Sequence, residues 1–195
     1  MGTRHLIAVY YDGAYRIAQY GQWDGYPNGQ GIKVLDFLKT ADFDRFKEKL
    51  KLVHFETKAE EKEKDQFFKE IGVEDGWMDA EQVNRYHRRY PLLTRDNGAK
   101  ILQMVYDLEE PAFLQDSLNF AMDSLFCEWA YVINFDKEVL EVYKGFNQDP
   151  VPIGRFTSTT ANSQGYYCIK LKKMYPLHRL PAKEDFIHDL EPDEE

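Results

Sequence analysis

The segment from Gln19 to Gly31 gathers side chains that could bind a small ligand. Its amide, aromatic and carboxylate groups are Gln22, Trp23, Asp24, Tyr26, Asn28 and Gln30, with glycines between them. Glycines let a backbone approach a ligand closely, and free amides at the start of a following helix bind anions or carbonyl oxygens. With Arg4 beside it, the segment predicts a site that binds, or binds and hydrolyses, a small polar, nucleotide-like or amide-bearing ligand.

A structural interpretation of the same segment stays open. In that interpretation the glycines serve only backbone geometry, Trp23 and Tyr26 are packing anchors, and Asp24 accepts from a nearby amide as in an Asx-turn. In the functional interpretation the loop forms the wall of the main concave site, and Asp24 is its most important side chain. The segment has neither the Gly-Lys-Ser/Thr of a P-loop nor the glycine spacing of a dinucleotide fingerprint.

Thr3 is a candidate nucleophile, because Gly2-Thr3 opens directly into a predicted strand. N-terminal-nucleophile hydrolases have such a junction, where a freed threonine amine acts as the base for its own hydroxyl. The side chains that could complete such a site are Arg4, Asp24, Asn134 and Asn162. Ordinary removal of Met1 would expose Gly2 instead, so the simpler interpretation is a hydroxyl at a strand end.

Metal-ligand patterns do not occur in the sequence. The five histidines are dispersed, with neither a His-x-His nor a His-Glu-x-x-His pair, so the sequence predicts no metal and no cofactor. The basic cluster from Arg85 to Arg89 has two interpretations. It interacts with the dipole at the end of a helix, or it docks an acidic or phosphate-bearing partner.

The composition favours a folded chain with an acidic surface. Of 195 residues, 43% are hydrophobic and 15% aromatic, and the formal net charge of −9 disfavours binding to nucleic acid or to anionic membranes. No apolar run approaches the ~20 residues that span a bilayer, and no signal-peptide pattern is present. We expect a cytoplasmic protein whose partner is a small polar ligand or another protein. Its two cysteines, Cys127 and Cys168, are expected to be reduced and apart.

Two-residue periodicity predicts a sheet of about five strands. The expected strands are residues 6–11, 14–20, 129–135, 139–144 and 166–172. Asp12-Gly13 joins the first two, and this pair suits a type I′ turn because both central positions need a positive φ. Since both hairpins are local, we expect an antiparallel sheet. The polar stretch 145–165 is expected to be a surface loop.

Helical spacing predicts a set of helices between the two hairpins. The expected helices begin near Ile32 and near Asp42 (with Val53 on its apolar stripe), and then cover residues 79–89, 98–108 and 112–126. The charged segment 57–70 is expected to be helical or partly disordered. Asp79 and Gln82 form a capping box, and Pro91 ends that helix. The outline predicts a single α+β domain over residues 1–190, followed by a frayed acidic tail at 191–195.

A family resemblance rests on three segments: the opening Met-Gly-Thr-Arg-His-Leu, the Tyr-Gly-Gln-Trp-Asp-Gly-Tyr-Pro-Asn-Gly-Gln-Gly loop at 20–31, and residues 128–133. These segments resemble a widespread family of uncharacterised phage, bacterial and fungal proteins. The resemblance covers most of the chain, and the loop motif is specific to the family. It implies no activity for individual residues, but a phage or mobile-element setting implies interference with host machinery.

Two hypotheses of function follow. The first is a small-ligand domain acting at the 19–31 loop, which a pocket lined by Trp23, Asp24 and Tyr26, with Arg4 or His5 beside it, would favour. The second is an interaction protein that inhibits a host macromolecule through an acidic and aromatic surface. Those same residues packed in the core, with a flat acidic patch elsewhere, would favour the second hypothesis.

Overall fold

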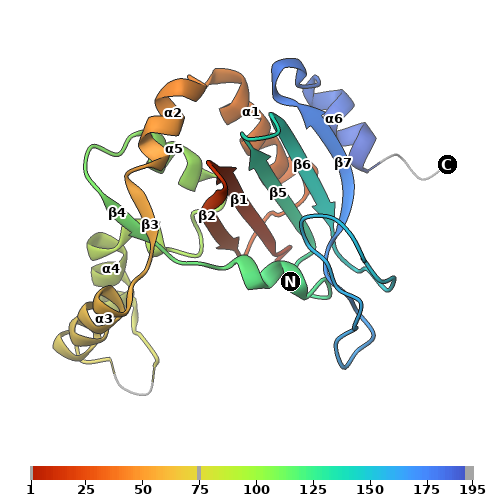
Figure 1. Cartoon of the computed structure of the whole chain (residues 1–195). Helices are drawn as coiled ribbons and strands as arrows, with labels where there is room; N and C mark the ends of the chain where they lie inside the picture. Colours follow the sequence, from red (N-terminus) through yellow and green to blue (C-terminus); the bar gives the residue numbers. More distant parts are fainter. Residues whose placement is uncertain (1, 74–75, 192–195) are drawn as a thin grey trace.

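The fold is built on a five-stranded sheet with the strand order β2-β1-β5-β6-β7 (Figure 1). Its strands are β1 (His5–Tyr11), β2 (Ala14–Gly21), β5 (Trp129–Asn134), β6 (Val139–Lys144) and β7 (Lys170–Pro176). The computed structural model describes residues 2–73 and 76–191, so Met1 and positions 192–195 of the predicted acidic tail lie outside the described residues.

Helices and short turns accompany this sheet, which gives the α+β class that the sequence predicts. The helices of the described ranges are α1 (Ile32–Thr40), α2 (Phe43–Leu50), α3 (Lys58–Glu70), α4 (Ala80–Arg89), α5 (Lys100–Tyr106) and α6 (Lys183–Leu190). A π-helical turn covers Pro27–Gly31, and 3-10 turns cover Pro91–Leu93, Leu118–Met122 and Leu177–Arg179. None of the helices in the described ranges has the length and apolar character needed to cross a bilayer.

The first hairpin is confirmed, together with its turn. Asp12 has a φ of 54° and Gly13 a φ of 71°, as a type I′ turn requires. The carboxylate of Asp136, in the turn between β5 and β6, accepts from the amides of Asp12 and Gly13 at 2.8 and 2.9 Å. One side chain therefore joins the turns of the two hairpins.

The expectation of a wholly antiparallel sheet is wrong at its centre. The β1·β2, β5·β6 and β6·β7 pairs are antiparallel, but β1 and β5 run parallel, with His5 opposite Trp129 and Tyr10 opposite Asn134. Parallel neighbours require a long crossover connection, and the helices between β2 and β5 supply it. Because the two strands run parallel, the C-terminal ends of β1 and β5 lie side by side at the same end of the sheet.

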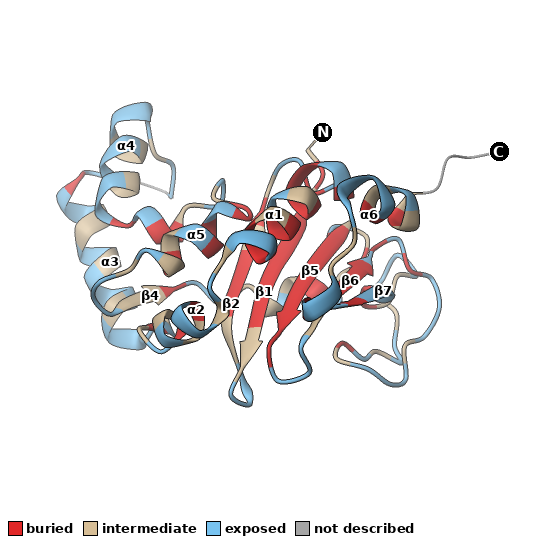
Figure 2. Cartoon of the chain, turned by 90° about the horizontal axis from the view of Figure 1, so that it is seen from above, coloured by how far each residue is buried: buried red, intermediate tan, exposed pale blue. Residues whose placement is uncertain are grey.

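One face of the sheet is covered by helices (Figure 2). Ile7, Val9 and Ile133 point to this face and share a core with side chains of α1, α2, α5 and α6, among them Phe46 and Phe186. Each fully buried aliphatic or aromatic side chain of this kind stabilises the fold by roughly 1.5–3 kcal/mol. This core is the main stabilising layer of the described structure.

The other face carries a smaller core. Leu6, Ala8 and Val132 pack there against the 118–122 turn and against the loop that follows β6, through Phe156 and Ile169. The stretch 145–165 contains no named strand or helix, as predicted, and carries only one isolated bridge between Val151 and Ser158. The loop leaves part of this face open beyond the small core.

A peripheral unit is formed by the short parallel strands β3 (Val53–Phe55) and β4 (Ala112–Leu114) with α3 and α4. Neither α3 nor α4 has a fully buried residue, and both lie away from the main sheet (Figure 2). The predicted capping box of Asp79 and Gln82 is confirmed, and residues 58–70 are helical. The cluster from Arg85 to Arg89 lies on α4, where Arg89 pairs with Glu63 at 2.7 Å.

Several predicted elements are wrong or displaced. The helix expected over 112–126 is instead β4 and a 3-10 turn, because residues 112–114 pair with β3 and Ser117 donates to the Ala18 carbonyl. Val53 lies in β3, since α2 ends at Leu50. The last strand is residues 170–176, and α6 was not predicted. Cys127 and Cys168 are free and buried, as expected.

Candidate functional site

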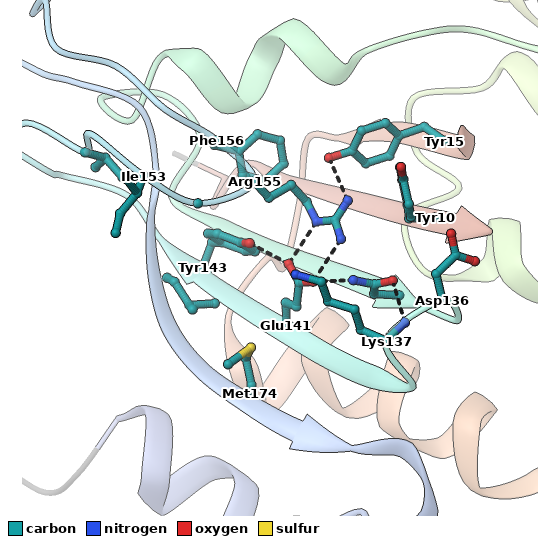
Figure 3. A pocket seen from close by; sticks show the side chains of 14 residues that line it. Tyr10, Tyr15, Asp136, Lys137, Glu141, Tyr143, Ile153, Arg155, Phe156 and Met174 are labelled. Carbon is teal, nitrogen blue, oxygen red and sulfur yellow. Dashed lines mark hydrogen bonds and ion pairs between the residues drawn. The ribbon is translucent and has the colours of Figure 1, made fainter. Parts of the chain in front are cut away.

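A cavity of about 820 Å³ opens on the face of the sheet opposite the helices, beside the C-terminal ends of β1 and β5 (Figure 3). Tyr10 of β1 and Asn134 of β5 face it because they follow the alternation of Leu6, Ala8 and Val132 on that face. The loop after β6 forms a wall, and β7 adds Leu171 and Met174. The cavity therefore joins strand positions to a loop that is distant in sequence.

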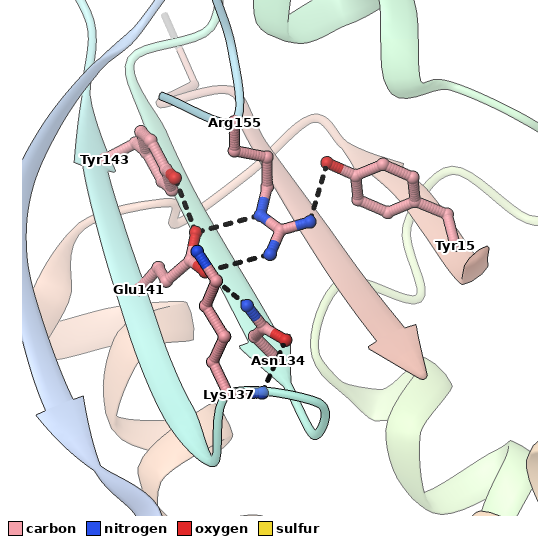
Figure 4. A network of polar contacts seen from close by, with 6 residues as sticks. All are labelled: Tyr15, Asn134, Lys137, Glu141, Tyr143 and Arg155. Atoms are coloured by element: carbon pink, nitrogen blue, oxygen red, sulfur yellow. Dashed lines mark hydrogen bonds and ion pairs between the residues drawn. The ribbon is translucent and has the colours of Figure 1, made fainter. Parts of the chain in front are cut away.

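Glu141 of β6 is the centre of a hydrogen-bond network in this cavity (Figure 4). Its Oε1 accepts from Asn134 Nδ2 at 2.7 Å and from Arg155 Nη2 at 3.0 Å. Its Oε2 accepts from Arg155 Nε at 2.9 Å and from the Tyr143 hydroxyl. Both oxygens are fully occupied, so the carboxylate has a positioning role and is not a free general base.

Burial and hydrogen bonding together set the pKa of each charged or titratable group in this network. Burial alone would raise the pKa of Glu141, but the hydrogen bonds from Arg155, Tyr143 and Asn134 outweigh burial and lower it. For Arg155, burial is again the larger single effect, yet bonds to Glu141 and Tyr15 together raise its pKa. Burial and the bond to Glu141 raise the pKa of Tyr143. At neutral pH the network is therefore a carboxylate, a guanidinium and a neutral phenol.

Arg155 is held in place by aromatic rings as well as by Glu141. Its guanidinium carbon lies 4.4 Å from the centroid of the Tyr10 ring, and its Nη1 donates to the Tyr15 hydroxyl at 3.4 Å. Three N–H bonds of the guanidinium are used within the network. The remaining N–H bonds can donate to a ligand without breaking any of these contacts.

The mouth of the cavity combines a lysine with exposed apolar groups. Lys137 lies in the β5–β6 turn and forms no ion pair with another described residue. Ile153 is 82% exposed and Met174 53% exposed, both at this rim. The neighbouring Asp136 is already engaged with the first hairpin turn. Donor groups therefore predominate over free acceptors around the cavity.

Patterns in the sequence do not predict this site, although one signal is present. Glu141 lies in the run Val139-Leu140-Glu141-Val142-Tyr143, which is buried on both faces. A carboxylate is almost never fully buried without a partner, so it required a cation from elsewhere in the chain. That cation is Arg155, which lies in a stretch predicted only as a surface loop.

The 19–31 loop lies at the opposite end of the strands from the cavity. Its first part pairs with the start of β1, where Gly21 is opposite His5, whereas Tyr10 lies at the other end of β1. These positions are separated by roughly 16 Å along the strand. None of the residues predicted to bind a ligand in this loop lines the cavity.

Close packing explains several of the glycines in the loop and the amide of Gln30. A Cβ on Gly29 would lie 2.3 Å from the Asp24 carbonyl oxygen, and Gln30 Oε1 accepts from the Ala99 amide at 2.9 Å. The Tyr131 hydroxyl donates to the Gly25 carbonyl at 2.9 Å. Asp24, with a φ of 62°, pairs through its carboxylate with Lys33 at 3.1 Å and not with an amide as in an Asx-turn.

The expectation of free amides before the helix is wrong. Within the π-helical turn, Gly29 and Gly31 donate to the Tyr26 carbonyl and Gln30 donates to the Asp24 carbonyl. These amides are therefore already bonded where a ligand was expected.

Trp23 and Tyr26 are about half exposed, at 54% and 46%. Gln22 accepts from the Tyr20 hydroxyl at 2.6 Å, and Asn28 is exposed.

Two of the residues proposed to surround Thr3, Asn134 and Asn162, are engaged elsewhere. Thr3 is buried, and its carbonyl accepts from Gly25. Asn134 belongs to the distant cavity, and Asn162 donates to Asp123 at 3.3 Å. The Arg4 guanidinium lies 4.6 Å from the centroid of the Phe126 ring.

His5, which was expected only to lie beside a pocket at the 19–31 loop, is a buried polar side chain. It is 1% exposed, and neither ring nitrogen has a hydrogen-bond partner among the described residues. Its ring packs so closely on Gly21 and Gly25 that a Cβ at either glycine would overlap the side chain.

Comparison of the chain with protein-family models, with curated proteins and with solved structures finds no match. Within the described ranges, no group of three or more histidine, cysteine, aspartate or glutamate side chains is arranged to hold a metal ion. The site must therefore be interpreted from its own geometry.

Proposed function

We propose that the protein binds a small organic ligand in the 820 Å³ cavity. The ligand carries a hydrogen-bond acceptor group, such as a carboxylate or phosphate, together with an apolar body. The observation that carries the proposal is the position of Arg155, which a buried and fully bonded Glu141 holds at the cavity. The volume is in the range of small-molecule sites, roughly 300–1,000 Å³.

The chemistry of the lining supports this class of ligand. Arg155, Lys137 and the Tyr15 hydroxyl are donors or cations, while the two carboxylates of the cavity, Glu141 and Asp136, already accept from other groups. An acceptor-rich group would therefore meet Arg155. The apolar body would contact Ile153 and Met174 at the rim. Because Glu141 is fully bonded, the geometry supports binding and gives no support for hydrolysis.

Two other functions remain proposals with weaker support. Ligand binding at the 19–31 loop is supported by the half-exposed rings of Trp23 and Tyr26 and by the unpartnered ring of His5. An interaction protein directed at a host macromolecule is supported by exposed apolar groups such as Trp77, which is 85% exposed.

Native mass spectrometry of the purified protein after incubation with cell extract tests the proposal. We expect the wild-type protein to retain a small molecule. The double variant Glu141→Gln/Arg155→Met, which removes both charges of the pair at similar volume, should be folded and should retain none. A circular dichroism spectrum checks the fold.

Matched variants locate the site. Lys183→Gln removes an exposed amine that pairs with Asp36, on the helix-covered face of the sheet opposite the cavity. This variant should retain the molecule as the wild type does. Trp23→Ala tests the loop. Loss of the molecule in Trp23→Ala but not in the double variant would move the site to the loop. Retention of a macromolecule alone would support the interaction hypothesis and contradict the cavity proposal.

A further inference from the structure

A second hollow lies at the other end of the β6–β7 pair and is basic, although the chain as a whole is acidic. Its volume is about 460 Å³, and its charged lining consists of Lys144, Lys170, Lys172 and Asp149. The formal net charge of the chain is −9. Only Asp149 opposes the three lysines, and it reaches Lys170 at 3.4 Å with both side chains more than half exposed. The hollow therefore has an excess of positive charge.

The lysines are placed where they repel one another. Lys144 of β6 is the direct cross-strand partner of Lys170 of β7, and like charges in such positions destabilise a sheet. Lys172 is the extra residue at the bulge, between Leu171 opposite Tyr143 and Lys173 opposite Val142. Lysines on the edge strand β7 also prevent pairing with other chains. Lys144 lies on β6, inside the sheet, where its amine is 5.3 Å from the centroid of the Trp129 ring, and this contact leaves its charge without a carboxylate partner among the described residues.

Phe146 adds an exposed aromatic ring to the same hollow. Its φ is 53°, a left-handed conformation that is strained for a bulky residue, and its side chain is 53% exposed. The backbone is held there on both sides: Phe146 donates to the Ser124 carbonyl at 2.7 Å, and the Asn147 amide donates to Ser124 Oγ at 3.0 Å. The fold thus fixes an aromatic ring toward solvent beside the lysines.

We propose that this hollow is a second ligand site, which binds a phosphate-bearing molecule with a planar ring. Lys144, Lys170 and Lys172 contact the phosphate groups, and their mutual repulsion is relieved when the anion binds. The Phe146 ring stacks on the planar group, a contact that tolerates different bases because each has a π-face. The site is separate from the Arg155 cavity, although Leu171 lines both hollows.

Nuclear magnetic resonance titration of the ¹⁵N-labelled full chain with ADP and with inorganic pyrophosphate tests this proposal. ADP should shift the amides of residues 144–149 and 170–172, with a Kd of about 1 mM or lower. Lys144→Gln and Lys170→Gln should each weaken both probes by about fivefold at low salt. Lys173→Gln is the matched control, because that amine pairs with Asp189 at 3.0 Å and lies outside the hollow.

Phe146→Gly separates a binding role from a structural one. Glycine adopts a positive φ without strain, so this variant should have a higher melting temperature. It should also bind ADP about fivefold more weakly, and pyrophosphate unchanged. A lower melting temperature would show that the ring is needed for packing and would contradict the proposed role of Phe146.

Three other results would overturn the proposal of a second site. One is the lack of any shift at millimolar ADP. Another is an equal loss of affinity in Lys173→Gln, which would indicate diffuse charge attraction only. The third is a set of shifts confined to the residues around Tyr10 and Arg155, which would place the probe in the first cavity.

Discussion

Arg155 binds Glu141 through two parallel hydrogen bonds, Nε to Oε2 at 2.9 Å and Nη2 to Oε1 at 3.0 Å. The Arg155 side chain is 12% exposed and the Glu141 side chain 5% exposed, so water solvates neither charge well. Such a pair costs desolvation energy, and its removal as a unit is often tolerated. Removal of one member leaves an uncompensated buried charge. The pair is therefore better explained by the position it gives Arg155 than by net stability.

Arg155→Met should lower the free energy of unfolding by about 3–5 kcal/mol, because it leaves the Glu141 carboxylate buried without its cation. In Glu141→Gln/Arg155→Met the loss should be within about 2 kcal/mol, since no charge remains unpaired. Urea unfolding at pH 7 measures both values. Equal losses in the single and double variants would show that the carboxylate is not the cause.

The buried ring of His5 should make the fold sensitive to acid. Burial lowers its pKa to about 4, although the neighbouring Thr3 backbone and Asp24 carboxylate favour the charged ring. The ordinary value for an unfolded chain is about 6.5. As the pH falls from 6.5 to 4, the unfolded state binds a proton that the folded state does not bind. The free energy of unfolding should therefore decrease by up to about 3 kcal/mol over this range.

His5→Leu removes this titration while the carboxylates remain. The difference in unfolding free energy between the wild type and His5→Leu should change with pH between 6.5 and 4 and be constant above 7. Equilibrium unfolding in urea at a series of pH values gives this difference. Parallel curves for the two proteins would show that His5 accepts a proton in the folded state as readily as in the unfolded one.

Local chemistry explains which parts of the fold could be predicted from the sequence. The Asp12-Gly13 turn and the Asp79–Gln82 capping box depend on residues within a few positions of one another. Two-residue periodicity located β5, but it is the same for parallel and antiparallel neighbours, so it could not show that β1 and β5 run parallel. The lysine-rich β7 is almost wholly exposed and carries little apolar alternation.

The candidate site depends on contacts that sequence patterns do not encode. Arg155 meets Tyr15 across 140 positions of the chain, and Tyr10 and Asn134 are neighbours only because of the parallel pair. In the 19–31 loop, Gly25 accepts from Tyr131 and Gln30 accepts from Ala99, and the sequence could not reveal either contact. The residues of the cavity and the packing of the 19–31 loop could therefore be identified only from the tertiary structure.

Gly29→Ala should destabilise the protein through a steric clash. Its Cβ would lie 2.3 Å from the Asp24 carbonyl oxygen and 2.5 Å from Asp24 Oδ1, so the loop must shift at a cost of about 1–3 kcal/mol. Gly13→Ala is the comparison, because nothing lies within 4 Å of its Cβ and only the strain of a φ of 71° remains. That strain costs roughly 1–2 kcal/mol. Thermal unfolding of both variants measures the two costs. Gly29→Ala/Asp24→Gly lacks the Oδ1 contact, so its loss relative to Asp24→Gly alone should be smaller than the loss of Gly29→Ala relative to the wild type.

Asp24 separates the structural and functional interpretations of the loop. Its carboxylate pairs with Lys33 while both side chains are about half exposed, at 54% and 55%, so the pair contributes at most about 1 kcal/mol. Asparagine tolerates the left-handed conformation that a φ of 62° requires, whereas alanine does not. We therefore expect Asp24→Asn to melt close to the wild type and Asp24→Ala to melt several degrees lower.

If the ligand binds in the Arg155 cavity, Asp24→Asn and Trp23→Ala should both retain the molecule that native mass spectrometry detects in the wild type. Loss of that molecule in Asp24→Asn, with an unchanged melting temperature, would instead identify the carboxylate of Asp24 as a ligand contact and the loop as the binding site.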